Sequence, residues 1–141
     1  MKPTTSQYFA SVIQNRLPDA AAVLQAAPGG GRIEGTVSFY QTPPGVLVTA
    51  AVRGLPVTRM ACAQPIFALH IHEGASCTGN AGDPFADAGT HYNPAGCPHP
   101  YHAGDLPPLF ADLTGFAWMA VLTDRFRVPD ILGRTVIVHS R

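Results

Sequence analysis

The chain has 141 residues, enough for one domain with a hydrophobic core and too few for two ordinary domains. Its formal net charge is zero and it carries no basic or acidic run, which argues against nucleic acid as a partner. Its apolar stretches are too short to span a membrane, and its 14 prolines and 14 glycines favour a loop-rich β protein.

The first 31 residues are predicted to form a helical extension followed by a linker. Four apolar residues recur there at helical spacing: Phe9, Val12, Ile13 and Leu17. Residues 20–27 are rich in good helix formers, so we expect Pro18 to separate two short helices. The sequence PGGGR at 28–32 is typical of a flexible joint; it lacks the strand and the Lys-Ser/Thr pair of a phosphate-binding loop.

This N-terminal region also bears on where the protein works. It lacks the continuous apolar core of a secretory signal, so we expect a cytoplasmic protein. The sequence leaves a secreted or periplasmic location open.

From residue 32 onward the pattern favours strands. The runs at 32–41 and 45–55 surround the turn-forming sequence TPPG and predict a hairpin. Further strands are predicted to end at His72 and to cover 115–123 and 133–139. Phe116 and Trp118 alternate along one face of the strand at 115–123 and are expected in the core. Residues 73–108 are expected to form a long irregular loop.

All six histidines lie in this second part of the chain. His70 and His72 end one strand and, being two residues apart, face the same side of it. The long loop holds three more, and His139 ends the last strand. The loop has few large apolar residues to pack, so we expect metal coordination to order it.

The spacing of these residues predicts two kinds of metal site. His91, His99, His102 and Asp105 would make a set of three nitrogens and one carboxylate, which suits zinc. The remaining histidines, His70, His72 and His139, offer an all-imidazole set, which suits copper. The residues alone leave open the alternative that the loop histidines are solvated polar side chains.

Five short motifs resemble the copper–zinc superoxide dismutase family: ALHIHEG, CTGNAG, AGTHYNP, HPYHAGDL and ILGRTVIVH. The hairpin EGTVSFYQTPPGVLVTAAVRGL also resembles the opening strands of that family, and the N-terminal extension resembles that of some bacterial members. The resemblance implies an all-β fold, a Greek-key β-barrel or sandwich with a long metal-binding loop. We therefore expect a helical extension and linker at 1–31 and a superoxide-dismutase-like β domain at 32–141.

The resemblance also implies the chemistry. It makes His70, His72, His91 and His139 ligands of copper, and His91, His99, His102 and Asp105 ligands of zinc. His91 would bridge the two ions and act in catalysis by taking up a proton. The expected activity is that of an oxidoreductase that disproportionates superoxide anion to dioxygen and hydrogen peroxide, with copper and zinc as cofactors.

The chain as written ends two residues after His139, where the family continues with a loop and a final strand. The family's second-shell aspartate, its anion-guiding arginine and the cysteine that pairs with the one matching Cys77 lie in that continuation. Arg141 lies too close to His139 to be equated with the guiding arginine. Two alternatives therefore stay open: a copper/zinc-binding protein with little or no activity, and an incomplete chain.

The remaining predictions concern partners and cysteines. Without the final strand two sheet edges would be open, so the family's dimer is in doubt and strand exchange at the open edge is possible. Three cysteines, Cys62, Cys77 and Cys97, leave at least one thiol unpaired within the chain. A Cys77–Cys97 bridge and three free thiols are both compatible with the sequence. We expect Arg134 to support the last strand or the loops.

Overall fold

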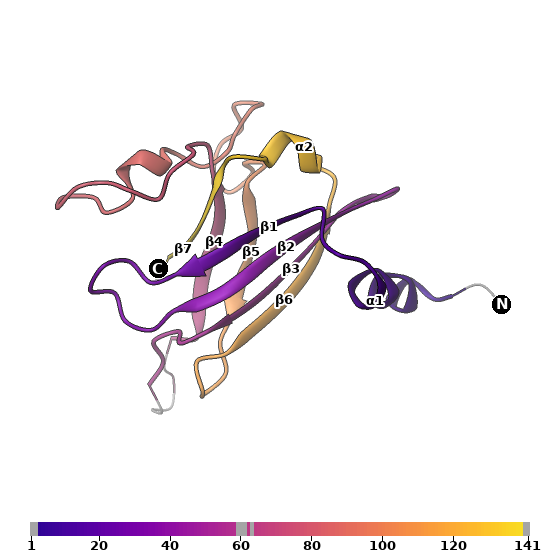
Figure 1. Cartoon of the computed structure of the whole chain (residues 1–141), viewed down its shortest axis with the longest axis horizontal. Helices are drawn as coiled ribbons and strands as arrows, with labels where there is room; N and C mark the ends of the chain where they lie inside the picture. The colour runs from indigo at the N-terminus through magenta and orange to yellow at the C-terminus, as the bar shows by residue number, and fades with distance from the viewer. Residues whose placement is uncertain (1–2, 59–61, 63, 140–141) are drawn as a thin grey trace.

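A computed structural model describes residues 3–58, 62 and 64–139 and shows two antiparallel sheets whose strands cross in Figure 1. One sheet has the order β1-β2-β3-β6, built from β1 (Ala20–Gln25), β2 (Glu34–Thr42), β3 (Gly45–Arg53) and β6 (Ala117–Thr123). The other has the order β5-β4-β7, built from β5 (Asp105–Phe110), β4 (Ile66–His72) and β7 (Thr135–His139). The predicted all-β, two-layer fold is confirmed.

Three short helical elements complete the described chain. They are α1 (Thr5–Asn15), the 3-10 turn η1 (Ala86–Ala88) and α2 (Val128–Ile131). None of the helices in the described residues is long and apolar enough to cross a membrane.

The predicted hairpin forms as β2 and β3. Thr42 pairs with Gly45 across Pro43-Pro44, and the register continues from there to Glu34 opposite Arg53. Alternate side chains of β3, from Val46 to Val52, point inward and are fully buried. Burial of these side chains in the space between the sheets is the main favourable contribution to folding.

The N-terminal segment differs from its prediction. The first helix is confirmed as α1, which begins at a capping box in which Thr4 and Gln7 each accept a hydrogen bond from the other's backbone N–H. The second helix is wrong, because residues 20–25 form strand β1, paired with β2 from Ala20 opposite Phe39 to Gln25 opposite Glu34. Alanine favours a helix only weakly, and pairing with β2 and burial of Leu24 override that preference.

This strand lies before the expected boundary at residues 31 and 32. It nevertheless belongs to the same sheet as β2, so the sheet begins inside the segment predicted as an extension. Within this segment, α1 lies outside the two sheets (Figure 1). Its Val12 packs on Tyr40 and Leu47, on the outer face of the first sheet. The division of the chain into an extension at 1–31 and one β domain at 32–141 stays a prediction.

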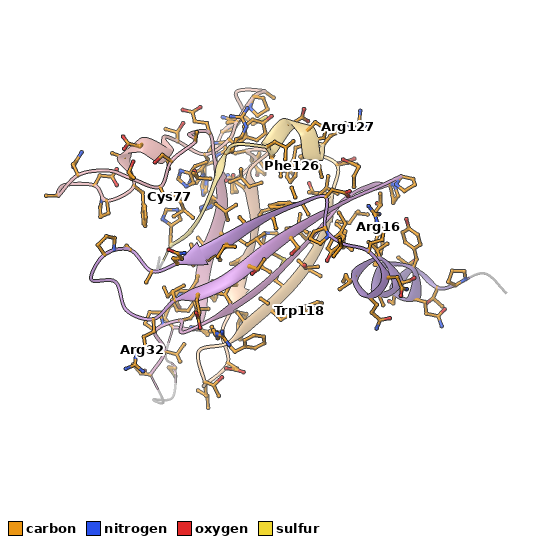
Figure 2. The ribbon with its side chains drawn as sticks, in the orientation of Figure 1. Arg16, Arg32, Cys77, Trp118, Phe126 and Arg127 are labelled. Carbon is orange, nitrogen blue, oxygen red and sulfur yellow. The ribbon has the colours of Figure 1, made fainter. Side chains whose placement is uncertain are left out.

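Two aromatic residues lie on the opposite face from the one predicted. Trp118 (labelled in Figure 2) is 57% exposed and Phe116 is 42% exposed, so the expectation that they belong to the core is wrong. The inward residues of β6 are instead Ala117, Met119 and Val121, which lie opposite the buried residues of β3. The alternation of side chains along this strand was predicted, but the face that becomes buried depends on which side of β6 meets the second sheet.

Part of the expected loop is a strand. β5 contains Pro107 and Pro108, which argue against a strand in sequence because proline cannot donate a backbone hydrogen bond. β5 lies at the edge of its sheet, where that loss is tolerated, and its Leu109 is fully buried. The three cysteines are free, so the bridge between Cys77 and Cys97 is not formed. Arg141 lies outside the described residues.

Candidate metal centre

Strand β4 presents different chemistry on its two faces. Leu69 and Ile71 point into the core and are almost completely buried. His70 and His72 alternate with them and face the other side, as the sequence predicts. β7 pairs with β4 and places His139 opposite Ala68. The His139 side chain reaches that of His72, and their Nε2 atoms lie 3.4 Å apart.

The segment that carries His91 is attached to the end of β4 by its backbone. His91 and His72 form an isolated antiparallel bridge, and Tyr92 N donates to Ile71 O at 2.7 Å. The imidazole of His91 stacks on that of His70, with ring centroids 3.9 Å apart. The loop histidine is thereby placed against the two histidines of the strand.

A second cluster forms where the loop enters β5. His102 N donates to Asp105 Oδ2, which is 2.9 Å away and belongs to the first residue of β5. His91 Nδ1 lies 3.2 Å from His102 Nδ1 and 3.0 Å from Asp105 Oδ1. His99 Nδ1 lies 3.6 Å from Asp105 Oδ2. The Asp105 side chain is only 7% exposed, whereas that of His99 is 61% exposed.

The seven residues make two groups that could each hold a metal ion. Within each group, one nitrogen or oxygen per residue lies within 4.8 Å of all the others: His70, His72, His91 and His139 in the first group, and His91, His99, His102 and Asp105 in the second. His91 belongs to both groups. Its Nδ1 approaches the second group, so its other ring nitrogen, Nε2, is left for the first.

Two buried polar atoms test whether these groups suit a metal. His70 Nδ1 and Asp105 Oδ1 are buried and have no hydrogen-bond partner among the described residues. Asp105 Oδ1 is close enough to His91 for an ion pair, but the geometry is not that of a hydrogen bond. Leaving such atoms unsatisfied costs about 1–3 kcal/mol each, and a cation bound in each group would offset that cost. The donor sets therefore fit metal ions.

The protonation of the first group also suits metal binding. Burial, and then the neighbouring charges of His91 and His139, lower the pKa of His70 from 6.5 to about 4. Burial is also the main cause of a lowered pKa for His91 and for His139. These imidazoles are therefore neutral at pH 7, the form in which histidine binds metals.

A backbone carbonyl orients one of these ligands. His72 Nδ1 lies 2.9 Å from Gly89 O, and because a carbonyl only accepts, Nδ1 must be the protonated nitrogen. The lone pair of His72 is then on Nε2, which faces His139. Nothing in the sequence identified Gly89, because the contact joins residues 17 positions apart.

Comparisons with known proteins agree with this geometry. The model of the copper/zinc superoxide dismutase family matches residues 33–141. A Cu-Zn superoxide dismutase of Legionella pneumophila is 34% identical over 112 residues, which are 75% of this chain and 62% of that protein. The human copper chaperone for superoxide dismutase is 29% identical over 133 residues, 89% of this chain and 44% of the chaperone. The chain thus spans about half the length of these curated relatives.

Comparison with solved structures also finds a copper/zinc superoxide dismutase. The Cu/Zn superoxide dismutase from Brucella abortus superposes with a TM-score of 0.66 at 27% sequence identity. The superposition covers 85% of this chain and 83% of that one.

Proposed function

Because the chain belongs to the copper/zinc superoxide dismutase family, we propose that it disproportionates superoxide to dioxygen and hydrogen peroxide. The observation that carries this proposal is the double membership of His91, whose ring lies between two groups of ligand atoms. A single shared imidazole is the simplest way for two neighbouring ions to act as one site. Two superoxide anions and two protons give one dioxygen and one hydrogen peroxide, so the site needs both an electron acceptor and a proton source.

We assign copper to His70, His72, His91 and His139, and zinc to His91, His99, His102 and Asp105. The all-imidazole donor set favours copper, and the set with a carboxylate favours zinc. When bound, copper would supply a one-electron couple, and zinc would supply a fixed positive charge on the far side of the shared ring. Asp105 places the only carboxylate of the cluster beside the second group, where it offsets that charge.

Within this site His91 is the proposed catalytic residue. Nδ1 of its ring is directed to the second group, and Nε2 is the atom that can hold a proton and release it to the departing product. His72, fixed by Gly89, holds the opposite side of the first group.

One preparation tests the proposal: metal content and superoxide consumption are measured on the same copper- and zinc-loaded sample. We expect about one copper and one zinc per chain, with superoxide consumption that a copper chelator abolishes. His139→Asn should lose copper and activity but keep zinc, whereas His102→Asn should mainly weaken zinc. Full copper with negligible consumption would leave a metal-binding protein without efficient turnover.

A second proposal concerns partners: we propose that a second copy of this chain exchanges a strand at the open edges of β1 and β7. Within the residues that the structure describes, each of these strands has a neighbour on one side only. The groove between them is lined by Val23, Leu24, Val136, Val138 and, from the loop, Cys77. An open strand edge readily pairs with another chain, and an apolar groove favours an occupant with apolar side chains.

The oligomeric state tests this second proposal. Ala22 points into the core beside the groove, so Ala22→Lys should convert the assembly to monomers in sedimentation experiments. Thr36→Lys, on the exposed outer face of β2, is the matched control and should leave the assembly intact. A parent protein that is monomeric at all concentrations would reject the proposal.

The compartment is also a proposal. We propose the cytoplasm, a reducing compartment that is compatible with the three free thiols of the structure. Fractionation of cells that express the protein from its own gene tests this, and recovery from the cell exterior would contradict it.

A further inference from the structure

Arg134 joins three segments of the chain that are distant in sequence. It is the residue directly before β7, and its Nε donates to Asp130 O in α2 at 2.9 Å. Its Nη1 donates to Glu73 O at 3.0 Å. Its guanidinium carbon lies 4.2 Å from the centroid of the Tyr92 ring. The superoxide chemistry proposed above does not use this side chain.

Two of these contacts involve the residues that directly follow proposed copper ligands. Glu73 follows His72, and Tyr92 follows His91. The same two segments are joined by the backbone bridge between His72 and His91 and by the hydrogen bond from Glu73 N to Thr90 O at 2.9 Å. Arg134 therefore lies at the junction between the end of β4 and the loop that carries the shared imidazole.

We propose that Arg134 is a positioning residue that sets the placement of His72 relative to His91. Its hydrogen bond holds the backbone beside His72, and its stacking on Tyr92 holds the backbone beside His91. The contact with Asp130 O anchors the guanidinium to α2. Arg134 itself directly precedes β7, the strand that ends at His139. One side chain thus ties together the three segments that supply His72, His91 and His139.

The chemistry of this contact requires arginine. The guanidinium is planar, so it can donate in its plane to two carbonyls while its face stacks on an aromatic ring. A lysine ammonium keeps the positive charge but can neither stack nor donate in two fixed directions. Arg134→Lys therefore separates the proposed positioning from a purely electrostatic role, such as attraction of an anion, which lysine would preserve.

The matched control is Arg53. It also lies on the surface and pairs with Glu34, at 2.6 Å, on the sheet that supplies none of the seven ligands. Arg53→Lys should change neither the metal site nor the histidine resonances.

The first measurement uses the metal-free protein, so it does not depend on the proposed copper role. We expect Arg134→Lys to shift the imidazole NMR resonances of His72 and His91 and to leave those of the exposed His99 nearly unchanged. Unchanged resonances of His72 and His91 would overturn the proposal. Thermal unfolding of the same variant shows whether it is folded.

The second measurement tests the inference at the loaded site, and this part rests on the proposed function. Loss of a partner bonded directly to a metal ligand typically weakens metal affinity by about 10–100-fold, and because Arg134 contacts the residues beside the ligands, we take the lower value of about 10-fold. We expect Arg134→Lys to raise the copper dissociation constant by that factor, in competition with a chelator, and to change the Cu(II) electron paramagnetic resonance spectrum. A spectrum and affinity equal to those of the parent would overturn the positioning role. A parent that binds no copper would instead reject the proposed function.

Discussion

Strand β3 and the segment 73–104 are held in place by different interactions. Every inward side chain of β3, from Val46 to Val52, is fully buried in the space between the sheets. Among the residues of 73–104, the buried apolar side chains are Ala88 and Tyr92. That segment depends instead on local hydrogen bonds, such as those from Gly82 N and Asp83 N to Asn80 Oδ1. Apolar burial thus defines the sheets, and polar contacts define the loop.

The metal centre lies where these two regions meet. β4 links the core to the site, because Leu69 and Ile71 contribute to the core while His70 and His72 contribute to the site. The rigid sheet fixes three of the proposed copper ligands, and the loop supplies the fourth, His91, together with His99 and His102. We therefore infer that metal binding mainly orders the loop, and the following experiments test this difference.

The largest expected effect comes from a cavity in the core beneath the site. Leu69 is fully buried, so Leu69→Ala should lower the free energy of unfolding of the metal-free protein by about 2–5 kcal/mol. Leu113→Ala, at a 66% exposed position between β5 and β6, is the matched control and should cost no more than about 0.5 kcal/mol. Urea unfolding measures both. Equal losses in the two variants would contradict the assignment of the core.

Metal binding should stabilise the loop more than the sheet. A ligand at 100 times its dissociation constant raises the free energy of unfolding by about 2.7 kcal/mol. We expect hydrogen exchange to show the new protection chiefly in residues 73–104, with little change in β2 and β3. Asp105→Asn should reduce the protection gained on addition of zinc. Uniform protection of both regions would contradict the inferred difference.

Acid should destabilise the metal-free protein through the histidines of the site. The pKa of His70 is lowered from 6.5 to about 4 in the folded state, so the unfolded chain takes up the proton first as pH falls. The contribution of His70 to stability is therefore complete above pH 6.5 and is lost progressively between about pH 6.5 and 4. Urea unfolding at several pH values measures this slope, which should be weaker in His70→Asn. A parent slope of zero across this range would contradict the burial of His70.

The smallest effect is expected on the outer face of the first sheet. Trp118 is the only tryptophan and is more than half exposed, so Trp118→Ser should change the free energy of unfolding by no more than about 0.5 kcal/mol. In the parent, acrylamide should quench its fluorescence efficiently. A loss of 2 kcal/mol or more would mean that another element or chain covers this face.

Sequence reasoning succeeded where a local pattern determined the structure. The strand-like runs at 32–41 and 45–55 around the turn sequence TPPG predicted the β2–β3 hairpin, and the two-residue spacing of His70 and His72 placed both on one face. The spacing of the histidines grouped His91, His99, His102 and Asp105, and separately His70, His72 and His139, and the structure brings each of these sets together. The place of His91 in both groups was implied by the family resemblance and not by the spacing. The metal that each group binds stays a prediction.

Sequence reasoning failed where contacts between residues far apart in the chain determined the structure. The strand at 20–25 depends on pairing with β2, and β5 tolerates Pro107 and Pro108 because it lies at an edge. The face of β6 that holds Trp118 depends on the position of the second sheet. Likewise, the contacts of Arg134 with Glu73 and Tyr92 join positions far apart in the chain, which no local pattern reports.

The sharing of His91 by two ions is tested most directly by diffraction from crystals of the copper- and zinc-loaded protein, with data collected at the absorption edge of each metal. We predict two anomalous peaks on opposite sides of the His91 ring, with copper beside Nε2 and zinc beside Nδ1. A single peak, or a His91 ring that touches neither ion, would contradict the account.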